Sequence, residues 1–270
     1  MTQTLRMRNF HNIATQNMKI DNMTARCSTL HLKTVSSGSS GNGYLIESDG
    51  RYLAIEAGVQ WEKFQQMCDF QMSLKCDALL VSHCHLDHCK YVSKFAKNGI
   101  YPICVGKNAV ESVENATSQK VYPLADLKWK AIGDWKVFPF QVHHDEVCYG
   151  YIIKTPSGES VLYATDFSYV GIDGHEYNFA PSNIDHFVVS VNYTDVPDEG
   201  ASEHVLRGHS SLDTVVNFLK TSMTDACKSI SLCHLSERNA DENLILDTIK
   251  KLAGDKVNVN ICKKGEVINL

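Results

Sequence analysis

The sequence lacks any long uninterrupted run of apolar residues. A membrane-spanning helix needs about 18 of them, and no stretch of this chain approaches that length. The opening MTQTLRMRNFHNIATQNMKIDNM also lacks the apolar segment that a secretory signal contains. These absences predict a globular protein with no membrane partner and a cytoplasmic location.

The chain has ten cysteines but no Cys-x-x-Cys pair. Pairs at that spacing are typical of zinc ribbons, and regular cysteine frameworks are typical of small disulfide-rich domains. Neither is indicated, so we expect reduced thiols in a reducing compartment.

An excess of basic residues is absent as well. The formal net charge is −5 and the pI is about 6.2, so the protein as a whole has no positive field to attract nucleic acid through counterion release. A metal centre or a local patch can still supply positive charge. Lys90, Lys94 and Lys97 recur at helical spacing, and they form either a solvated helix face or one side of a groove for a nucleic-acid strand.

The pattern of the chain changes after a polar beginning. Residues 1–27 show no helical or strand periodicity, which predicts a loose N-terminal extension, and residues 28–270 alternate short apolar runs with Gly, Ser and Asp. This second part is long enough to bury a substantial core as one domain. We expect strands at 30–35, 43–48, 52–58, 77–83, 102–106, 128–145, 149–167, 186–193 and 229–236, and helices at 61–70, 88–98, 210–223 and 243–254.

Three histidines and an aspartate follow the expected strand 77–83 in the run SHCHLDHCKYV. Neutral imidazoles and a carboxylate suit zinc, manganese or iron, and a short loop fixes them at little entropic cost. The alternative is a histidine-rich surface loop that binds nothing. The spacing of His83, His85, Asp87 and His88 directly after a buried strand favours a metal site.

The pattern His83-x-His85-x-Asp87-His88 resembles the signature of the metallo-β-lactamase superfamily. The resemblance implies an α/β fold, a four-layer αβ/βα sandwich with two divalent metal ions, Zn or Mn, at the edge between its sheets. It also directs the search for further ligands to the ends of later strands.

Three later residues stand at such strand ends: His144 after VFPFQV, Asp166 after VLYA and His234 after SISLC. By resemblance, His83, His85 and His144 hold one metal, Asp87, His88 and His234 hold the other, and Asp166 bridges both. His143 is a rival to His144. The following Asp145 favours His144, because the family has His then Asp there.

Two further segments resemble the YycJ/WalJ-type exonuclease-like proteins of this superfamily. Residues 36–42, SSGSSGN, are similar to their opening motif, which makes Ser40 and Asn42 candidate substrate contacts, although such a turn can also be merely flexible. The run HLSERN from His234 resembles their terminal motif. Together the motifs cover residues 30 to 240.

The segment Arg207-Gly208-His209-Ser210 opens an expected helix. It resembles the Gly-His-Leu-Ser of YycJ-type proteins and a motif of RNase Z in which the histidine is linked with proton donation. An anion would suit the helix N-terminus beside His209. The alternative is plain helix initiation, with Ser210 and Asp213 as a capping box.

Two positions depart from the family pattern. Glu56 stands where Asp is common, and we expect it to orient a histidine of the centre through a longer side chain. Ser190-Val191-Asn192-Tyr193 stands where the family has an acidic residue before Asn, and this segment is expected to alter the substrate wall.

The resemblance implies a metal-dependent phosphodiesterase in which two metal ions activate a hydroxide. Asp87 would orient that hydroxide and His209 would protonate the leaving oxygen. The expected substrate is a nucleic-acid end, DNA first, and the alternative is a cyclic nucleotide or another small phosphodiester. A non-catalytic metal-binding module and an iron oxidoreductase are the competing classes, although no room exists for a fused flavin domain.

Overall fold

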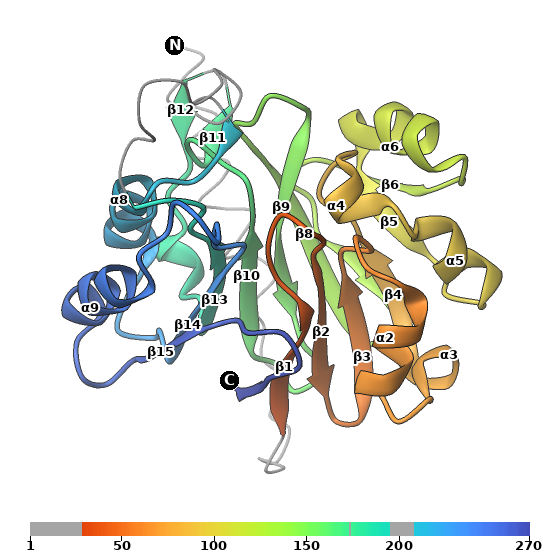
Figure 1. The fold of residues 1–270 in the computed structure, drawn as a ribbon, viewed down its shortest axis with the longest axis horizontal. Coiled ribbons are helices and arrows are strands. Elements are labelled where there is room, and N and C mark those ends of the chain that lie inside the picture. Colours follow the sequence, from red (N-terminus) through yellow and green to blue (C-terminus); the bar gives the residue numbers. More distant parts are fainter. Residues whose placement is uncertain (1–28, 173, 195–207) are drawn as a thin grey trace.

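Two seven-stranded β-sheets pack face to face and carry helices on their outer sides (Figure 1). The computed structural model describes residues 29–172, 174–194 and 208–270. The predicted extension over residues 1–27 lies outside the described residues.

The first sheet has the strand order β16-β1-β2-β3-β4-β5-β6. Its strands are β1 (Leu30–Ser36), β2 (Gly43–Ser48), β3 (Arg51–Ile55), β4 (Cys76–Leu80), β5 (Ile103–Gly106), β6 (Tyr122–Leu124) and β16 (Val267–Asn269). Strands β3 to β6 run parallel to one another. The ends of β3 and β4 therefore lie at the same edge of the sheet.

The second sheet has the order β15-β14-β13-β10-β9-β8-β7. Its strands are β7 (Lys130–Ile132), β8 (Trp135–Val142), β9 (Cys148–Lys154), β10 (Ser160–Ala164), β13 (His186–Ser190), β14 (Ser229–Cys233) and β15 (Asn258–Ile261). Strands β10, β13, β14 and β15 are parallel, and the first three are buried along their whole length. This burial accounts for their nearly continuous apolar sequences. A small hairpin, β11 (Gly171–Ile172) with β12 (His175–Glu176), lies beside the end of β8.

Helices cover the outer sides of both sheets (Figure 1). The helices beside the first sheet are α2 (Trp61–Met67), α3 (Met72–Lys75), α4 (Leu86–Cys89), α5 (Val92–Lys97) and α6 (Val110–Thr117), and those beside the second are α8 (Leu212–Ser222) and α9 (Glu242–Ala253). Two 3-10 turns, η1 (Lys107–Ala109) and η2 (Ala180–Ser182), complete the described helical elements. The predicted four-layer sandwich is confirmed. No described helix has the length and apolarity that crossing a membrane requires.

Two predicted helices are wrong in their extent. The helix predicted at 61–70 ends at Met67, because Asp69 and Phe70 adopt positive φ angles of 48° and 59°. The helix predicted at 88–98 begins earlier, at Leu86, and breaks into α4 and α5. The break follows from a long-range contact, since the Tyr91 N–H donates to the Ala57 carbonyl at 2.8 Å instead of continuing the helix. The terminal strands β15 and β16 were not anticipated from the sequence.

Buried apolar side chains form two cores. One includes the fully buried Tyr44, Tyr151 and Tyr163 between the sheets and extends to helices α2 and α5 outside the first sheet. The other lies between the second sheet and its helices, where Phe187 packs near Phe218 of α8. Full burial of such a side chain contributes about 1.5–3 kcal/mol to folding. The two cores hold both sheets rigidly and thereby fix the strand ends that carry the polar residues.

Candidate metal centre

The seven predicted metal ligands lie at the C-terminal ends of strands from both sheets. They follow β4 (His83, His85, Asp87, His88), β8 (His144), β10 (Asp166) and β14 (His234). Asp166 and His234 leave their strands with φ angles of 50° and 55°. This left-handed conformation is uncommon for residues other than glycine and costs about 1–3 kcal/mol, and it recurs where function requires a fixed direction.

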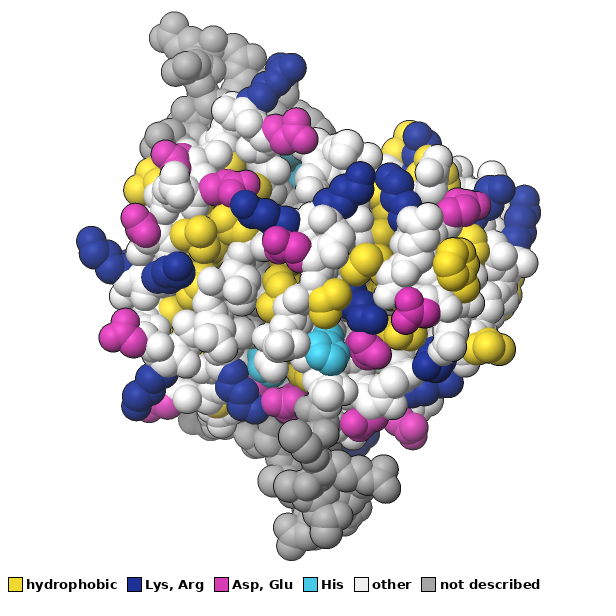
Figure 2. All heavy atoms as spheres, turned by 60° about the horizontal axis from the view of Figure 1, so that its bottom comes forward, with side chains coloured by type: hydrophobic (Ala, Val, Ile, Leu, Met, Phe, Trp, Pro, Cys, Tyr) yellow, Lys and Arg dark blue, Asp and Glu magenta, His cyan; other side chains and the backbone are white. Residues whose placement is uncertain are grey.

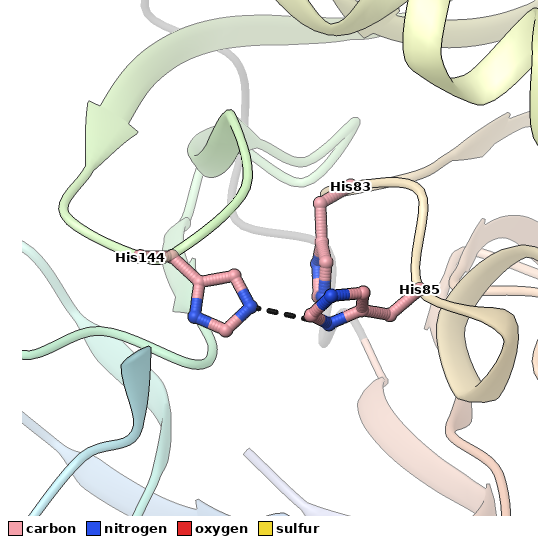
Figure 3. Close-up of side chains that lie close together, drawn as sticks. All are labelled: His83, His85 and His144. Carbon is pink, nitrogen blue, oxygen red and sulfur yellow. Dashed lines mark hydrogen bonds between the residues drawn. The ribbon is translucent and has the colours of Figure 1, made fainter. Parts of the chain in front are cut away.

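The first cluster, which we name the imidazole group, consists of His83, His85 and His144 (Figure 3). One ring nitrogen of each lies within 4.8 Å of the others, a spacing that could hold a metal ion. His144 Nε2 lies 3.3 Å from His85 Nδ1. Asp145 borders the group, with its Oδ1 2.9 Å from His144 Nε2.

The second cluster, the carboxylate group, consists of Asp87, His88, Asp166 and His234. Asp87 Oδ2 lies 3.3 Å from His88 Nε2 and 3.2 Å from His234 Nε2. Asp166 Oδ2 lies 3.0 Å from the same atom of His88 and 3.6 Å from that of His234. Asp166 also completes a third possible set of ligands with His83 and His88, so it stands between the two groups.

Three of the histidines, His144, His88 and His83, point one ring nitrogen toward the cluster and the other toward a group of the surrounding protein. His144 Nδ1 donates to the Gly208 carbonyl at 2.5 Å, and His83 Nδ1 lies 2.8 Å from Ser82 Oγ. The buried His88 Nδ1 makes no hydrogen bond within the described residues and lies at ion-pair distance, 3.4 Å, from Glu56 Oε1. Partners of this kind fix the tautomer and leave the inner lone pair for a metal.

His83 supplies a direct test of whether a metal fits. Its Nε2 is buried and has no hydrogen-bond partner among the described residues. A buried polar atom without a partner costs free energy, so it needs an explanation. A metal ion bound to this lone pair supplies one, and the donor set of imidazoles and carboxylates is the set that zinc and manganese accept.

The electrostatics divide the cluster in two. Burial lowers the pKa of His83 well below its ordinary value and that of His144 to about 4, so both rings are neutral at pH 7. Burial also acts to lower the pKa of His88 and of His234. In these two rings the opposing effect of neighbouring carboxylates, Glu56 for His88 and Asp166 for His234, is larger and raises the pKa.

The two aspartates of the carboxylate group are held ionised. Burial acts to raise their pKa values, but the neighbouring histidines outweigh it. Hydrogen bonds from His234 and His88 lower the pKa of Asp87, and the positive charge of His234 with a hydrogen bond from His88 lowers that of Asp166. Both carboxylates are therefore ready to bind a cation across the neutral pH range.

Glu56 lies beneath His88 at the end of β3. It is fully buried and has a positive φ of 60°. Its Oε1 accepts the Tyr163 hydroxyl at 3.0 Å, and its Oε2 accepts the Ser82 N–H at 3.2 Å. These bonds hold the Glu56 carboxylate in place against the His88 ring. The glutamate, which is longer than the aspartate common in the family, thus reaches a histidine of the centre.

The turn of residues 36–42 contacts three members of the carboxylate group. The buried Asn42 amide lies 3.2 Å from His88 Nε2 and 3.4 Å from Asp87 Oδ2. The Ser37 hydroxyl accepts the His234 N–H at 2.8 Å. Ser40 is exposed. The prediction that Ser40 and Asn42 contact substrate stays a prediction, and the Asn42 amide already has partners within the cluster.

His209 stands over both groups. Its ring centroid lies 6.1 Å from that of His144 and 6.4 Å from that of His234. The proposed capping box of Ser210 with Asp213 is wrong, because the N-cap of α8 is Ser211, whose hydroxyl accepts the Thr214 N–H at 3.0 Å. The Ser210 side chain therefore does not cap α8. Arg207, from the same motif, lies outside the described residues.

Hydrogen bonds of Ser210 and Asn192 connect the segment around His209 to Asp166. This role of the two residues was not predicted from the sequence. The Ser210 hydroxyl accepts the Phe167 N–H at 3.1 Å, and the Ser210 N–H donates to Asn192 Oδ1 at 2.8 Å. Asn192 Nδ2 in turn donates to Asp166 Oδ1 at 3.0 Å and lies 3.1 Å from His234 Nδ1. The available signal was a polar residue, Asn192, two positions after the end of strand β13.

The rival histidine, His143, does not join the cluster. Its side chain is exposed and its Nδ1 lies 2.7 Å from Ser168 Oγ. His144 is the member of the pair that lies with His83 and His85 (Figure 3).

Curated proteins with similar sequences are nucleases by name. The chain is 24% identical over 247 residues to the exodeoxyribonuclease WalJ of Streptococcus pneumoniae, covering 84% of this chain and 90% of WalJ. It is 25% identical over 244 residues to the exodeoxyribonuclease YycJ of Bacillus anthracis, with the same coverage of 84% and 90%. The resemblance to YycJ/WalJ-type proteins is confirmed.

Solved structures share the fold. YhfI of Bacillus subtilis, a metallo-β-lactamase fold protein, has a TM-score of 0.67 at 19% identity and covers 90% of this chain and 100% of its own. Human tRNase Z, short form, has a TM-score of 0.58 at 15% identity, with 88% and 98% covered. Residues 64–223, more than half of the chain, match the beta-lactamase superfamily domain. The chain therefore belongs to the beta-lactamase superfamily and has the metallo-β-lactamase fold.

Proposed function

We propose that this protein is a metal-dependent phosphodiesterase that degrades DNA from its ends. The observation that carries the proposal is the convergence of seven nitrogen and oxygen donors on one centre, with His83 Nε2 buried and lacking a hydrogen-bond partner within the described residues. The names of the similar curated proteins, exodeoxyribonucleases, support DNA as the substrate. A reducing cytoplasmic location belongs to the same proposal, supported by nine unpaired cysteines in the described residues.

In the proposed mechanism, the two groups of residues bind different metal ions. The imidazole group holds one divalent ion and the carboxylate group holds the second, with Asp166 between them. When bound, zinc or manganese lowers the pKa of water and stabilises negative charge on phosphate oxygens. Asp87, held by His88 and His234, orients the attacking water from the edge of the carboxylate group.

His209 is proposed as the proton donor to the leaving oxygen. It is half-buried, and its ring lies above both groups at similar distances from His144 and His234. Ser210 and Asn192 fix the adjoining backbone against Asp166, so the donor keeps its distance from the centre. A general acid must be held within hydrogen-bond reach of the oxygen that it protonates.

Charges of both signs are mixed on the face that lies at the bottom of Figure 1, away from the histidine loop. There, Lys and Arg side chains are interspersed with Asp and Glu side chains rather than gathered in a patch (Figure 2). Lys90, Lys94 and Lys97 are exposed in the segment that follows the histidine loop. We propose that these lysines provide a short track for the strand beside the centre, with Ser40 as a further contact.

The test is a parallel assay of metal-reconstituted protein on 5′-end-labelled DNA, RNA and cyclic nucleotides. DNA is expected to be degraded fastest with manganese or zinc, with a KM that rises with salt, since each phosphate neutralised contributes a slope of about −0.7 to −0.9. Faster hydrolysis of cyclic nucleotides, insensitive to salt, would instead assign a small-phosphodiester hydrolase. A protein that binds metal but hydrolyses none of these substrates would be a non-catalytic module.

A further inference from the structure

The hydrolytic centre does not use His143, although this residue adjoins His144 in the chain. Its imidazole is exposed, while the His144 ring is buried among the ligands of the imidazole group. The two neighbouring Cα atoms are about 3.8 Å apart. His143 is therefore the chain neighbour of a candidate ligand, and its bridge partner Tyr169 lies three residues after Asp166 and two before β11.

The His143 ring is held in one orientation. It stacks on Tyr169 with ring centroids 4.6 Å apart and an interplanar angle of 18°. The His143 N–H donates to the Tyr169 carbonyl at 3.0 Å, and the Ser168 N–H donates to the His143 carbonyl at 2.9 Å. The Tyr169 hydroxyl accepts the Gly174 N–H at 3.1 Å, which fixes the second ring as well.

A flat ring that is already fixed loses little entropy when another flat group stacks on it. Nucleobases stack on aromatic side chains regardless of their identity, because every base has a π-face. Tyr169 covers one face of the His143 ring, and the residue is nevertheless exposed to solvent. Such a surface would accept a base whose phosphate lies at the centre.

We propose that His143 and Tyr169 form a stacking platform for the nucleobase next to the phosphodiester that is hydrolysed. This inference rests on the proposed function. The platform would distinguish a nucleic-acid end from a small phosphodiester that has no base, and it would do so without selecting one base over another. It supplies affinity that the net charge of −5 does not.

The experiment compares two DNA substrates that differ only in the terminal nucleotide, which carries a base in one and is abasic in the other. The variant His143→Ala is expected to raise KM for the normal end about 5- to 150-fold, the factor that one lost base stack gives. Its kcat and metal content should stay unchanged. The abasic end should raise KM for the wild type by a similar factor and should leave the variant unaffected.

Two further variants separate stacking from structure. His143→Trp should restore the KM for the normal end, because it keeps an aromatic face. His175→Ala removes another exposed histidine, on β12, and should behave as the wild type. Fluorescence anisotropy of a labelled oligonucleotide with metal-loaded protein measures the contribution of the platform to DNA binding, independently of turnover.

The outcomes separate this inference from the proposed function. If the wild type degrades DNA but His143→Ala has an unchanged KM and unchanged binding, the platform is refuted and the proposed function stands. If His143→Ala loses metal, His143 is a ligand and the platform is refuted. If the wild type does not hydrolyse DNA, the proposed function fails, and equal anisotropy with normal and abasic ends would overturn the platform too.

Discussion

The imidazole group and the carboxylate group lie side by side but differ in charge. In the imidazole group the two buried rings, His83 and His144, are neutral, and His85 keeps 29% of its side chain exposed. The carboxylate group contains two ionised aspartates; Asp87 keeps 26% of its side chain exposed, and Asp166, His88 and His234 keep 4% or less. Because opposite charges attract more strongly where water is excluded, the carboxylate group should hold a divalent ion more tightly. We therefore expect one centre with two metal sites of unequal affinity.

Asp166→Asn should have the largest effect, because this carboxylate contacts both groups. The amide keeps the shape but removes the charge that faces His88 and His234. The wild type is expected to bind about two ions per chain and the variant at most one. Activity should fall on the order of 10³-fold or more, since a catalytic metal supplies several kcal/mol.

Elemental analysis and the DNA assay measure this prediction together. Asp247→Asn is the matched control, because Asp247 is an exposed carboxylate on α9, far along the chain from every predicted ligand. A variant of Asp166 that kept two ions and full activity would remove Asp166 from the centre and leave the two groups independent.

His209→Ala should separate proton donation from metal binding. Both groups are expected to keep their ions, because neither depends on the His209 ring, and turnover should fall by about 10²–10⁴, the range of a general acid. Metal content and kcat are measured on the same preparation. Normal turnover would return His209 to a structural role at the start of α8.

Two variants test the metal affinity of the two groups separately: Glu56→Gln for the carboxylate group and Ser82→Ala for the imidazole group. Glu56 supports His88 of the carboxylate group, and the Ser82 hydroxyl supports His83 of the imidazole group. Loss of such a partner typically lowers metal affinity about 10- to 100-fold. Chelator titration should show that each variant weakens a different one of the two ions. Loss of the same ion in both variants would contradict the division into two groups.

The sequence was sufficient to predict that the seven candidate ligands lie together, because each stands at or a few residues after the end of an apolar strand. Strand ends meet at one edge of a sheet, so His144, Asp166 and His234 were foreseeable beside the histidine loop. Glu56 was foreseeable for the same reason. The fold followed from the order of strands and helices together with the family resemblance.

Contacts between distant segments were not predictable in this way. The break between α4 and α5 depends on the Ala57 carbonyl, which lies 34 residues before Tyr91 in the chain and binds its N–H. The link from Asn192 to Ser210 likewise needs the strand end and the helix start to be brought together in space. Local periodicity contains no information about such pairs, so the residues that support the centre became visible only in the fold.

Acidification should weaken the two sites unequally, by at most about tenfold per pH unit for each proton released. The pKa values of His88 and His234 are raised, so these rings carry protons in the metal-free protein near neutral pH and must release them to bind an ion. His83 and His144 have lowered pKa values, about 4 for His144, and are already neutral. The aspartates stay ionised throughout. Calorimetric titration in buffers of different ionisation enthalpy should therefore detect more proton release when the carboxylate group binds an ion than when the imidazole group binds one, because His83 and His144 have no proton to release. As the pH falls from 7.5 to 6, the metal affinity of the carboxylate group should decrease more steeply than that of the imidazole group. The difference in metal affinity between the two sites should therefore become smaller. Equal proton release from both would mean that the four histidines share one electrostatic environment and that the comparison does not hold.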